Sequence, residues 1–313
     1  MPFDIKSKLV VAVASSALFN LGEADQVFRE EGEERYREYQ RARENEVLAP
    51  GAAFEFVRRL LSLNVSSDDS PVEVILLSRN DPDTGLRVMN SIEAHGLPIT
   101  RAAFVTGSNP HRYARRFFAS IFLSANQEDV RRAMDSGYPA GLVIDSLLNS
   151  DLKDPELRIA FDFDGVLADD EAEAVFELSG LNAFFQAEQQ QADRPHNPGP
   201  LHELLVKVAA VQRQEKVRKQ ADPHYRPKLR LAIVTARNAP AHKRVVTSLR
   251  EWGVEIDETF FLGGMEKTGI LEEFRPHIFF DDQMLHIDPA TEVAPCVHVP
   301  FGVRNRRTPP TQR

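Results

Sequence analysis

Apolar and polar stretches alternate along this chain in the same order twice. Each half begins with an apolar strand, followed by a polar or helical insert, a second apolar strand, and a helix that ends at Gly96 or Gly253. A short strand, a further helix and another strand complete each half. Strands that alternate with helices are typical of parallel βαβ units. The pattern therefore predicts an α/β protein made of two halves, each with its own parallel sheet.

The two halves also resemble each other in sequence. VILLSRNDP (residues 74–82) resembles AIVTARNAP (residues 232–240) at an offset of 158 residues, which aligns Arg79 with Arg237. After a one-residue gap the likeness continues at an offset of 157, and AVASSALF (12–19) aligns with AFDFDGVL (160–167) at an offset of 148. A polar stretch rich in turn formers, NSDLKDP (149–155), lies between the halves. We therefore expect an internal repeat with domains at residues 1–150 and 151–313.

Two polar segments fall outside this predicted repeat. Residues 22–47 are dense in Glu and Arg and predict a pair of surface helices with mixed charges. Residues 169–228 predict one helix near 170–178, a polar connection, and a second helix over 201–220. The second segment is inserted after the first strand of its half, where an open parallel sheet presents its ligand crevice. This position favours a helical cap over a site, rather than a decorative loop.

Composition excludes several classes of protein. The chain has 313 residues, 42% of them hydrophobic, with 38 Lys+Arg against 47 Asp+Glu and a net charge of −9. A core can form, but binding of polymeric nucleic acid through many phosphate contacts is disfavoured. A single cysteine, Cys296, excludes an internal disulfide and fits a reducing compartment. No apolar run approaches the roughly 18 residues that span a bilayer. We expect a cytoplasmic protein without a membrane partner, and a homo-oligomer is compatible with these features.

The apolar stretch over residues 9–19, preceded by Lys6 and Lys8, resembles a secretory signal. Because the repeat matches it to an internal strand of the second half, we expect it to remain in the folded protein.

Acidic residues follow predicted strands of the second half. Asp162 and Asp164 lie in FDFDGVL, where Gly165 indicates that the chain is already turning into a loop. Asp281 and Asp282 directly follow the strand HIFF. Parallel strands bring their carboxyl ends to one edge of a sheet, so these carboxylates are expected to converge. They would repel one another unless a divalent cation were bound, and oxygen ligands of this kind suit Mg²⁺.

Two further polar residues are expected at the same edge. Thr235 ends the strand LAIVT, and Lys267 lies near the start of a predicted helix. A metal ion and an amine in one place could together hold a phosphoryl group. The residues thus predict phosphoryl chemistry in the second half.

Taken in order, DFDGV, the strand ending in Thr235, Lys267 and the acid pair 281–282 resemble the four motifs of the haloacid dehalogenase (HAD) superfamily of phosphohydrolases. The chain is more closely similar to the cytosolic 5′-nucleotidase type I family, through AVASSALF, LADDEAE, VTAR and RPHIFFDDQ. This resemblance covers nearly the whole chain. It implies HAD-like (Rossmann-like) folds for both halves and Mg²⁺-dependent hydrolysis of nucleoside 5′-monophosphates, AMP being the family's usual preference.

The resemblance also implies roles for individual residues. Asp162 would attack phosphorus to form an aspartyl phosphate, and Asp164 would act first as general acid and then as general base. Thr235 and Lys267 would bind the phosphate oxygens. Mg²⁺ would be held by the Asp162 carboxylate, the Asp164 backbone carbonyl and one of the pair Asp281 and Asp282, with the choice between these two left open.

Other candidates have competing interpretations. Arg237 and the adjacent Asn238 could reach a phosphate, but the match of Arg237 to Arg79 indicates a shared structural role equally well. Asp170, at the start of the cap, is either a metal or ribose contact or a helix N-terminal acid.

The repeat predicts that the first half is not catalytic, because Ala14 and Pro110 stand where the second half has Asp162 and Lys267. Its polar strand ends, with Arg79 as their cation, either bind a nucleotide without hydrolysing it or are ordinary loop residues. Two other functions stay open for the chain as a whole: a phosphatase for another small phosphometabolite, and a nucleotide-binding regulatory protein.

Overall fold

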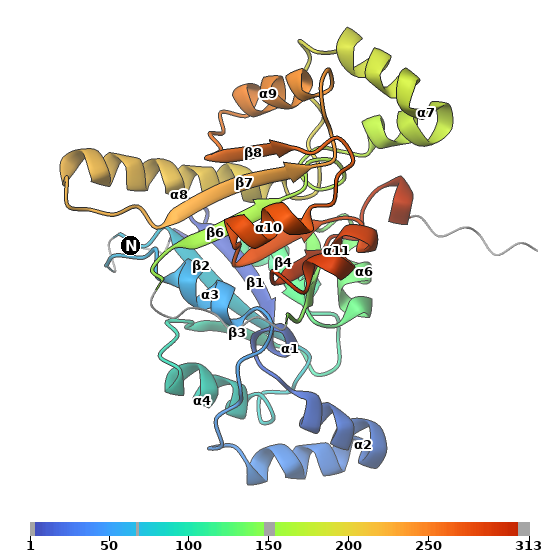
Figure 1. The fold of residues 1–313 in the computed structure, drawn as a ribbon. Coiled ribbons are helices and arrows are strands. Elements are labelled where there is room, and N and C mark those ends of the chain that lie inside the picture. The colour runs from blue at the N-terminus through green and yellow to red at the C-terminus, as the bar shows by residue number, and fades with distance from the viewer. Residues whose placement is uncertain (1–3, 67–68, 147–153, 306–313) are drawn as a thin grey trace, which may run out of the picture. The chain divides into compact units, whose positions relative to one another are not determined.

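The computed structural model describes residues 4–66, 69–146 and 154–305 (Figure 1). The chain divides into two compact units, residues 1–145 (unit 1) and 146–313 (unit 2). Most of the stretch 149–155, which the sequence marks as the boundary, lies outside the described residues. Each unit is an α/β structure with parallel strands, as the alternating pattern predicts.

Unit 1 contains five strands in the order β3-β2-β1-β4-β5, and all neighbouring strands are parallel. The strands are β1 (Leu9–Ala14), β2 (Val72–Ser78), β3 (Arg101–Phe104), β4 (Ile121–Ser124) and β5 (Ala140–Ile144). Every residue of β1 and β4 is buried. A continuous apolar run such as LVVAVA fits a strand that is covered on both faces of the sheet.

Unit 2 repeats this strand order with β8-β7-β6-β9-β10, again with parallel neighbours. Its strands are β6 (Leu157–Phe161), β7 (Leu229–Thr235), β8 (Glu258–Phe261), β9 (Ile278–Asp281) and β10 (Cys296–His298). The rings of Phe161 and Phe280 stack between β6 and β9 with centroids 5.1 Å apart. In both units the first strand in the sequence is therefore central, and the fourth strand lies beside it.

Helices connect the strands in each unit. Those of unit 1 are α1 (Ser15–Leu18), α2 (Gly22–Ala42), α3 (Phe54–Leu61), α4 (Leu86–Ala94), α5 (His111–Ala114) and α6 (Gln127–Asp135), with a 3-10 turn at Arg115–Phe117. Those of unit 2 are α7 (Glu171–Gln190), α8 (His202–Ala221), α9 (His242–Glu251), α10 (Thr268–Phe274) and α11 (Met284–Ala290), with a 3-10 turn at Val303–Asn305. The prediction of a second helix over 201–220 is confirmed by α8, whereas α7 is longer than the predicted helix near 170–178.

The hydrogen-bonding pattern shows which residues of the second strands, β2 and β7, are structurally equivalent. Equivalent residues lie 157 positions apart in the sequence, not 158. Matching positions are the strand pairs Ser78 with Phe104 and Thr235 with Phe261, and the turn bonds from Gly107 N to Arg79 O and from Gly264 N to Ala236 O. Arg79 therefore occupies the position of Ala236, and Asn80 that of Arg237. The alignment of Arg79 with Arg237 is wrong because short identical sequences can match better one residue out of structural register.

The segment 22–47 is also part of the structural correspondence. Helix α2 is interrupted at Gly32 (φ 86°) and α7 at Gly180 (φ 78°), and these glycines lie 148 residues apart in the sequence. A positive φ of this size favours glycine, which has no Cβ. Each helix is thus a bent pair in the same place after the first strand. The prediction of a helix pair is confirmed, but its placement outside the repeat is wrong.

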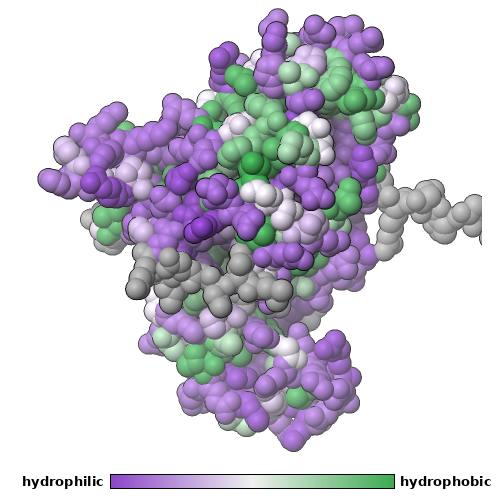
Figure 2. Space-filling view, in the orientation of Figure 1, coloured by the Kyte–Doolittle hydropathy of each residue, from purple (hydrophilic) through white to green (hydrophobic). Residues whose placement is uncertain are grey.

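The described helices include none long and apolar enough to cross a membrane. Hydrophilic residues predominate on the face shown in Figure 2. Among the exposed large apolar side chains, Leu178 on α7 is 87% exposed.

Candidate active site

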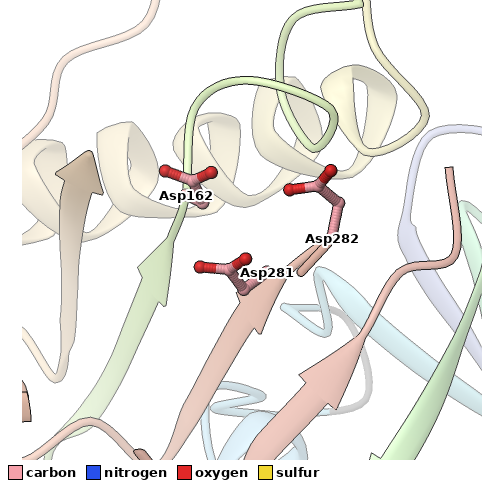
Figure 3. Close-up of side chains that lie close together, drawn as sticks. All are labelled: Asp162, Asp281 and Asp282. Atoms are coloured by element: carbon pink, nitrogen blue, oxygen red, sulfur yellow. The ribbon is translucent and has the colours of Figure 1, made fainter. Parts of the chain in front are cut away.

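Three carboxylates of unit 2 meet at the carboxyl ends of two neighbouring strands. Asp162 directly follows β6, Asp281 ends β9, and Asp282 follows it. One oxygen from each lies within 4.8 Å of the others, and all three residues are buried. Figure 3 shows the three side chains directed toward a common space. The predicted convergence is therefore present for three of the four acids, and Asp164 is not part of this cluster.

Backbone pairing between β6 and β9 explains why these acids meet. The strands are parallel with Phe161 opposite Phe280, and the amide of Asp162 donates to the carbonyl of Phe280 at 2.8 Å. The turn that follows Asp162 requires Gly165, which has φ 69°. A Cβ at this position would lie 2.7 Å from the Asp282 carboxylate. The glycine in DFDGV thus allows the loop to pass close to the acid pair.

Lys267 is the cation of this cluster. Its Nζ lies 2.8 Å from Asp162 Oδ1 and 2.7 Å from Asp281 Oδ2, and the side chain is buried. Burial alone lowers the pKa of Lys267, but the two adjacent carboxylates outweigh burial and hold that pKa above its ordinary value. Lys267 is therefore charged and fixes the direction of both carboxylates.

One positive charge does not balance three carboxylates. Neither oxygen of Asp282 accepts a hydrogen bond from the described residues. Burial, together with the charges of Asp162 and Asp281, raises the pKa of Asp282 to about 10. A buried carboxylate without partners is costly, and a divalent cation with a preference for oxygen ligands would remove that cost. The residues present therefore fit a divalent metal ion.

Asp164 lies beside Arg237. The guanidinium donates from Nε to Asp164 Oδ2 at 2.7 Å and from Nη2 to Asp164 Oδ1 at 2.6 Å. The amide of Arg237 also donates to the Thr235 hydroxyl at 3.2 Å, and both of these residues are buried. A paired arginine fork stabilises the ionised form of a carboxylate. The motif acid Asp164 and the strand-end Thr235 are thus linked through Arg237.

The amino-acid sequence was also compared with those of known proteins. Residues 1–306 match the family model described as 5′-nucleotidase. This chain belongs to the 5′-nucleotidase family. Human cytosolic 5′-nucleotidase 1B is 35% identical over 292 residues, which cover 91% of this chain and 47% of the human protein. The resemblance to cytosolic 5′-nucleotidase type I is thereby confirmed, and the chain spans about half the length of that relative.

A solved structure, histidinol dehydrogenase from Elizabethkingia anophelis, was also matched. It has a TM-score of 0.22 and 9% sequence identity, with 93% of this chain and 52% of that chain covered. Similarity at this level carries no inference about fold or function.

In this member of the 5′-nucleotidase family, a buried carboxylate that the sequence analysis did not identify links α7 to the rest of unit 2. Glu188 forms ion pairs with Arg237 and, at 2.8 Å, with Arg244 of α9. Its Oε2 also lies 3.2 Å from His196 Nε2. Burial opposes ionisation, but the hydrogen bond to His196 and the charge of Arg237 lower the pKa of Glu188 to about 2. Glu188 lies in the polar segment FFQAEQQQ, where nothing in the sequence marks it as buried.

The three weaker candidates have other neighbours. Asn238 packs against Gly263, where a Cβ would lie 3.1 Å from the Asn238 amide nitrogen. Asp170 directly precedes α7 and packs against Gly302 in the same way. Arg79 of unit 1 forms an ion pair with Asp129. These contacts do not involve the three carboxylates, so the roles of Asn238, Asp170 and Arg79 in substrate binding stay predictions.

Proposed function

We propose that the chain is a Mg²⁺-dependent 5′-nucleotidase that hydrolyses nucleoside 5′-monophosphates, of which AMP is one, to nucleoside and phosphate. The observation that carries the proposal is the buried cluster of Asp162, Asp281 and Asp282 around Lys267, in a chain of the 5′-nucleotidase family. The name of the human relative supports a cytosolic location.

Mg²⁺ would be held by carboxylate oxygens of Asp162 and Asp281, by the backbone carbonyl of Asp164, and by Asp282 either directly or as support. The unpaired oxygens of Asp282 support this ligand set. When bound, the ion would offset the negative charge shared by the substrate phosphate and these carboxylates. The other steps derive from groups of the chain itself.

Asp162 is the nucleophile of the first step. Burial, opposed by the charge of Lys267, raises the pKa of Asp162 to about 6, so the carboxylate is still ionised at neutral pH. Its oxygen forms a bond to phosphorus while the bond from phosphorus to the ribose 5′-oxygen breaks, giving an aspartyl phosphate. Lys267 and the Thr235 hydroxyl bind the phosphate oxygens and stabilise the charge that they carry in the transition state.

Asp164 carries the proton in both steps. Its protonated form gives the proton to the departing 5′-oxygen, and its carboxylate then accepts a proton from the water that attacks the aspartyl phosphate. That attack breaks the bond from phosphorus to Asp162 and releases phosphate. Because Arg237 donates two hydrogen bonds to the Asp164 carboxylate, the two side chains have to separate before Asp164 can reach the departing oxygen. Substrate phosphate is an alternative partner for the Arg237 guanidinium at that moment.

We further infer that the two units arose as a tandem repeat of a HAD-like fold, in which unit 2 is catalytic and unit 1 is not. Residues 169–228, which include α7 and α8, serve as a cap on the catalytic half. The shared strand order and the matching interruptions at Gly32 and Gly180 support the repeat. The ion pairs of Glu188 support a cap whose position is coupled to Arg237 and so to Asp164.

Phosphate release from a panel of nucleoside monophosphates and sugar phosphates, with and without Mg²⁺, tests this function. We expect Mg²⁺-dependent release from nucleoside 5′-monophosphates, with values of kcat/KM well above those for sugar phosphates. Preferential hydrolysis of a sugar phosphate would identify a phosphatase of another class of metabolite. Nucleotide binding without any release of phosphate would contradict the enzyme and indicate a regulatory protein.

A further inference from the structure

Unit 1 contains a cavity of about 360 Å³ at the carboxyl ends of its strands. Ala14, the last residue of β1, and Ala125, which follows β4, line it. Helix α2 contributes Asp25 and Tyr36. By the strand pairing described above, Ala14 and Ala125 occupy the positions of Asp162 and Asp282. The cavity therefore lies where unit 2 has its carboxylates, and its volume falls in the range of small-molecule sites.

The residues that line this cavity do not provide the net positive charge that would hold a phosphate. Pro110 occupies the position of Lys267. The one cation of the lining, Arg79, forms an ion pair with Asp129. Asp25 and Asp145 add two further carboxylates, which repel an anion. A phosphorylated ligand would thus meet a lining with more negative than positive charge.

The lining instead suits hydroxyl groups and an apolar ring. The Tyr36 hydroxyl donates to Asn80 Oδ1 at 3.1 Å, which fixes the orientation of that amide. Asn80 Nδ2 and Arg79 Nε are buried donors for which the described residues offer no acceptor. A hydroxyl of a ligand can accept from such donors and give its own proton to a carboxylate, as a ribose diol does. Tyr36, Ala52 and Ala125, which line the cavity and are not buried, supply apolar surface for a flat base.

We propose that this cavity binds an unphosphorylated nucleoside. The inference rests on the proposed function, because a nucleoside is the product released by the other unit. Unit 1 would then retain the part of the ancestral pocket that recognises ribose and base, while it has lost the part that recognises phosphate. The earlier alternative, in which Arg79 attracts a nucleotide phosphate, is disfavoured by the pairing of Arg79 with Asp129.

Calorimetry on the full chain in EDTA, with adenosine, AMP and inorganic phosphate as probes, tests the proposal. In Asn80→Asp the unpaired donor becomes another carboxylate, and we expect adenosine affinity at one site to fall by about tenfold or more. The matched control is Asn109→Asp, which adds the same charge in the same unit outside the lining and keeps the oxygen that accepts from Arg132. Adenosine affinity should be unchanged in that control, and kcat should be unchanged in both variants.

A second variant, Ser16→Leu, narrows the cavity without adding charge. It should also weaken adenosine binding, so the test does not depend on the folding of one variant. Equal adenosine affinity in the wild type and in folded Asn80→Asp and Ser16→Leu proteins would overturn the proposal. So would loss of AMP or phosphate binding as large as the loss of adenosine binding, since that would indicate an anion site. Hydrolysis of nucleoside monophosphates by the wild type is measured in a separate assay. If no hydrolysis were found, the proposed 5′-nucleotidase function would be contradicted, whereas the nucleoside site of unit 1 is tested by the binding data alone.

Discussion

The ends of strands β9 and β4 occupy equivalent positions in the two units and have the same backbone turn, but their side chains differ in charge. In unit 2, Asp281 ends β9 and receives a hydrogen bond from the amide of Gln283 at 2.8 Å. In unit 1, Ser124 ends β4 and receives the same bond from the amide of Asn126 at 3.1 Å. The turn is kept while the carboxylate is not. Such a backbone bond preserves the strand end whether or not the side chain can bind a metal.

The connection between the bent helix and the rest of each unit shows the same contrast. Arg244 forms an ion pair with Glu188 in unit 2, whereas Arg87 in unit 1 donates to the neutral Gln40 at 3.3 Å. Gln40 and Glu188 are both buried and lie 148 residues apart. At this position unit 2 thus has a buried carboxylate, whereas unit 1 has a buried neutral amide. This difference teaches that the same backbone arrangement can be held by a charged or by a neutral side chain at the same position.

Among the variants that would test this difference between the two units, Asp162→Asn should have the largest effect on activity. The change keeps the shape of the side chain but removes the nucleophilic charge, so kcat should fall by about 10⁴-fold or more. Steady-state kinetics on the purified variant measure this fall. Asp288→Asn, an exposed residue of the same unit, is the control and should leave kcat unchanged. Near wild-type kcat in a folded Asp162→Asn protein would remove Asp162 from the mechanism.

Removal of the metal should have the next largest effect. With Asp282 and its neighbours uncompensated, EDTA treatment should lower turnover by about 10³-fold, and added Mg²⁺ should restore it. Mg²⁺ should also raise the Tm of the wild type, because the ion binds only the folded carboxylate cluster, and it should raise the Tm of Asp282→Asn by less, because one carboxylate of that cluster is lost. Full activity after chelation and dialysis would contradict the metal site.

The variant Glu188→Gln gives α7 of unit 2 the neutral amide that Gln40 provides in α2 of unit 1. The folded pKa of Glu188 is about 2, below its ordinary value of 4.5, so its stabilising contribution is present above pH 4.5 and is lost as the pH falls toward 2. The variant should lower the unfolding free energy at pH 7 by about 3 kcal/mol, with a smaller difference at lower pH. Denaturant unfolding at several pH values measures this. Glu177→Gln, a partly exposed pair with Arg304, should cost less than about 1 kcal/mol; equal losses would show that Glu188 has no special role.

The smallest effect is expected in unit 1. Ser124→Ala removes the hydroxyl that accepts from the amide of Asn126, and it should lower stability by about 1 kcal/mol while leaving kcat unchanged. Thermal unfolding and a standard activity assay are sufficient. A fall in kcat of more than tenfold would mean that the strand ends of unit 1 take part in catalysis, and the contrast between the two units would fail.

Much of the site follows from local sequence. The apolar strands that end in Asp162, Thr235 and Asp281 are visible as runs of hydrophobic residues, and parallel strands necessarily bring their ends to one edge. The turn at Gly165 is visible too, because two acids followed by glycine indicate a loop. The structure brings Lys267 to the carboxylates as predicted. Its two ion pairs join it to acids at the ends of β6 and β9.

Other features could not be predicted in this way. Glu188 lies among glutamines, and its burial results from packing against Arg237 and Arg244, which are distant in sequence. The structural position of Arg79 could not be predicted either. Identical residues align Arg79 with Arg237, but the hydrogen bonds between paired strands, which set the structural register, do not.

The amino-acid sequence by itself determined the α/β class, the duplicated order of strands, and the identity of the acids at the strand ends. These depend on hydrophobic periodicity and on residue types close together in the chain. Tertiary structure alone decided that Asp164 is held by Arg237, that the carboxylate oxygens of Asp282 have no hydrogen-bond partner among the described residues, and that unit 1 contains a cavity. The reason is that charge pairing and burial depend on which distant side chains share a volume, and sequence order does not specify that volume.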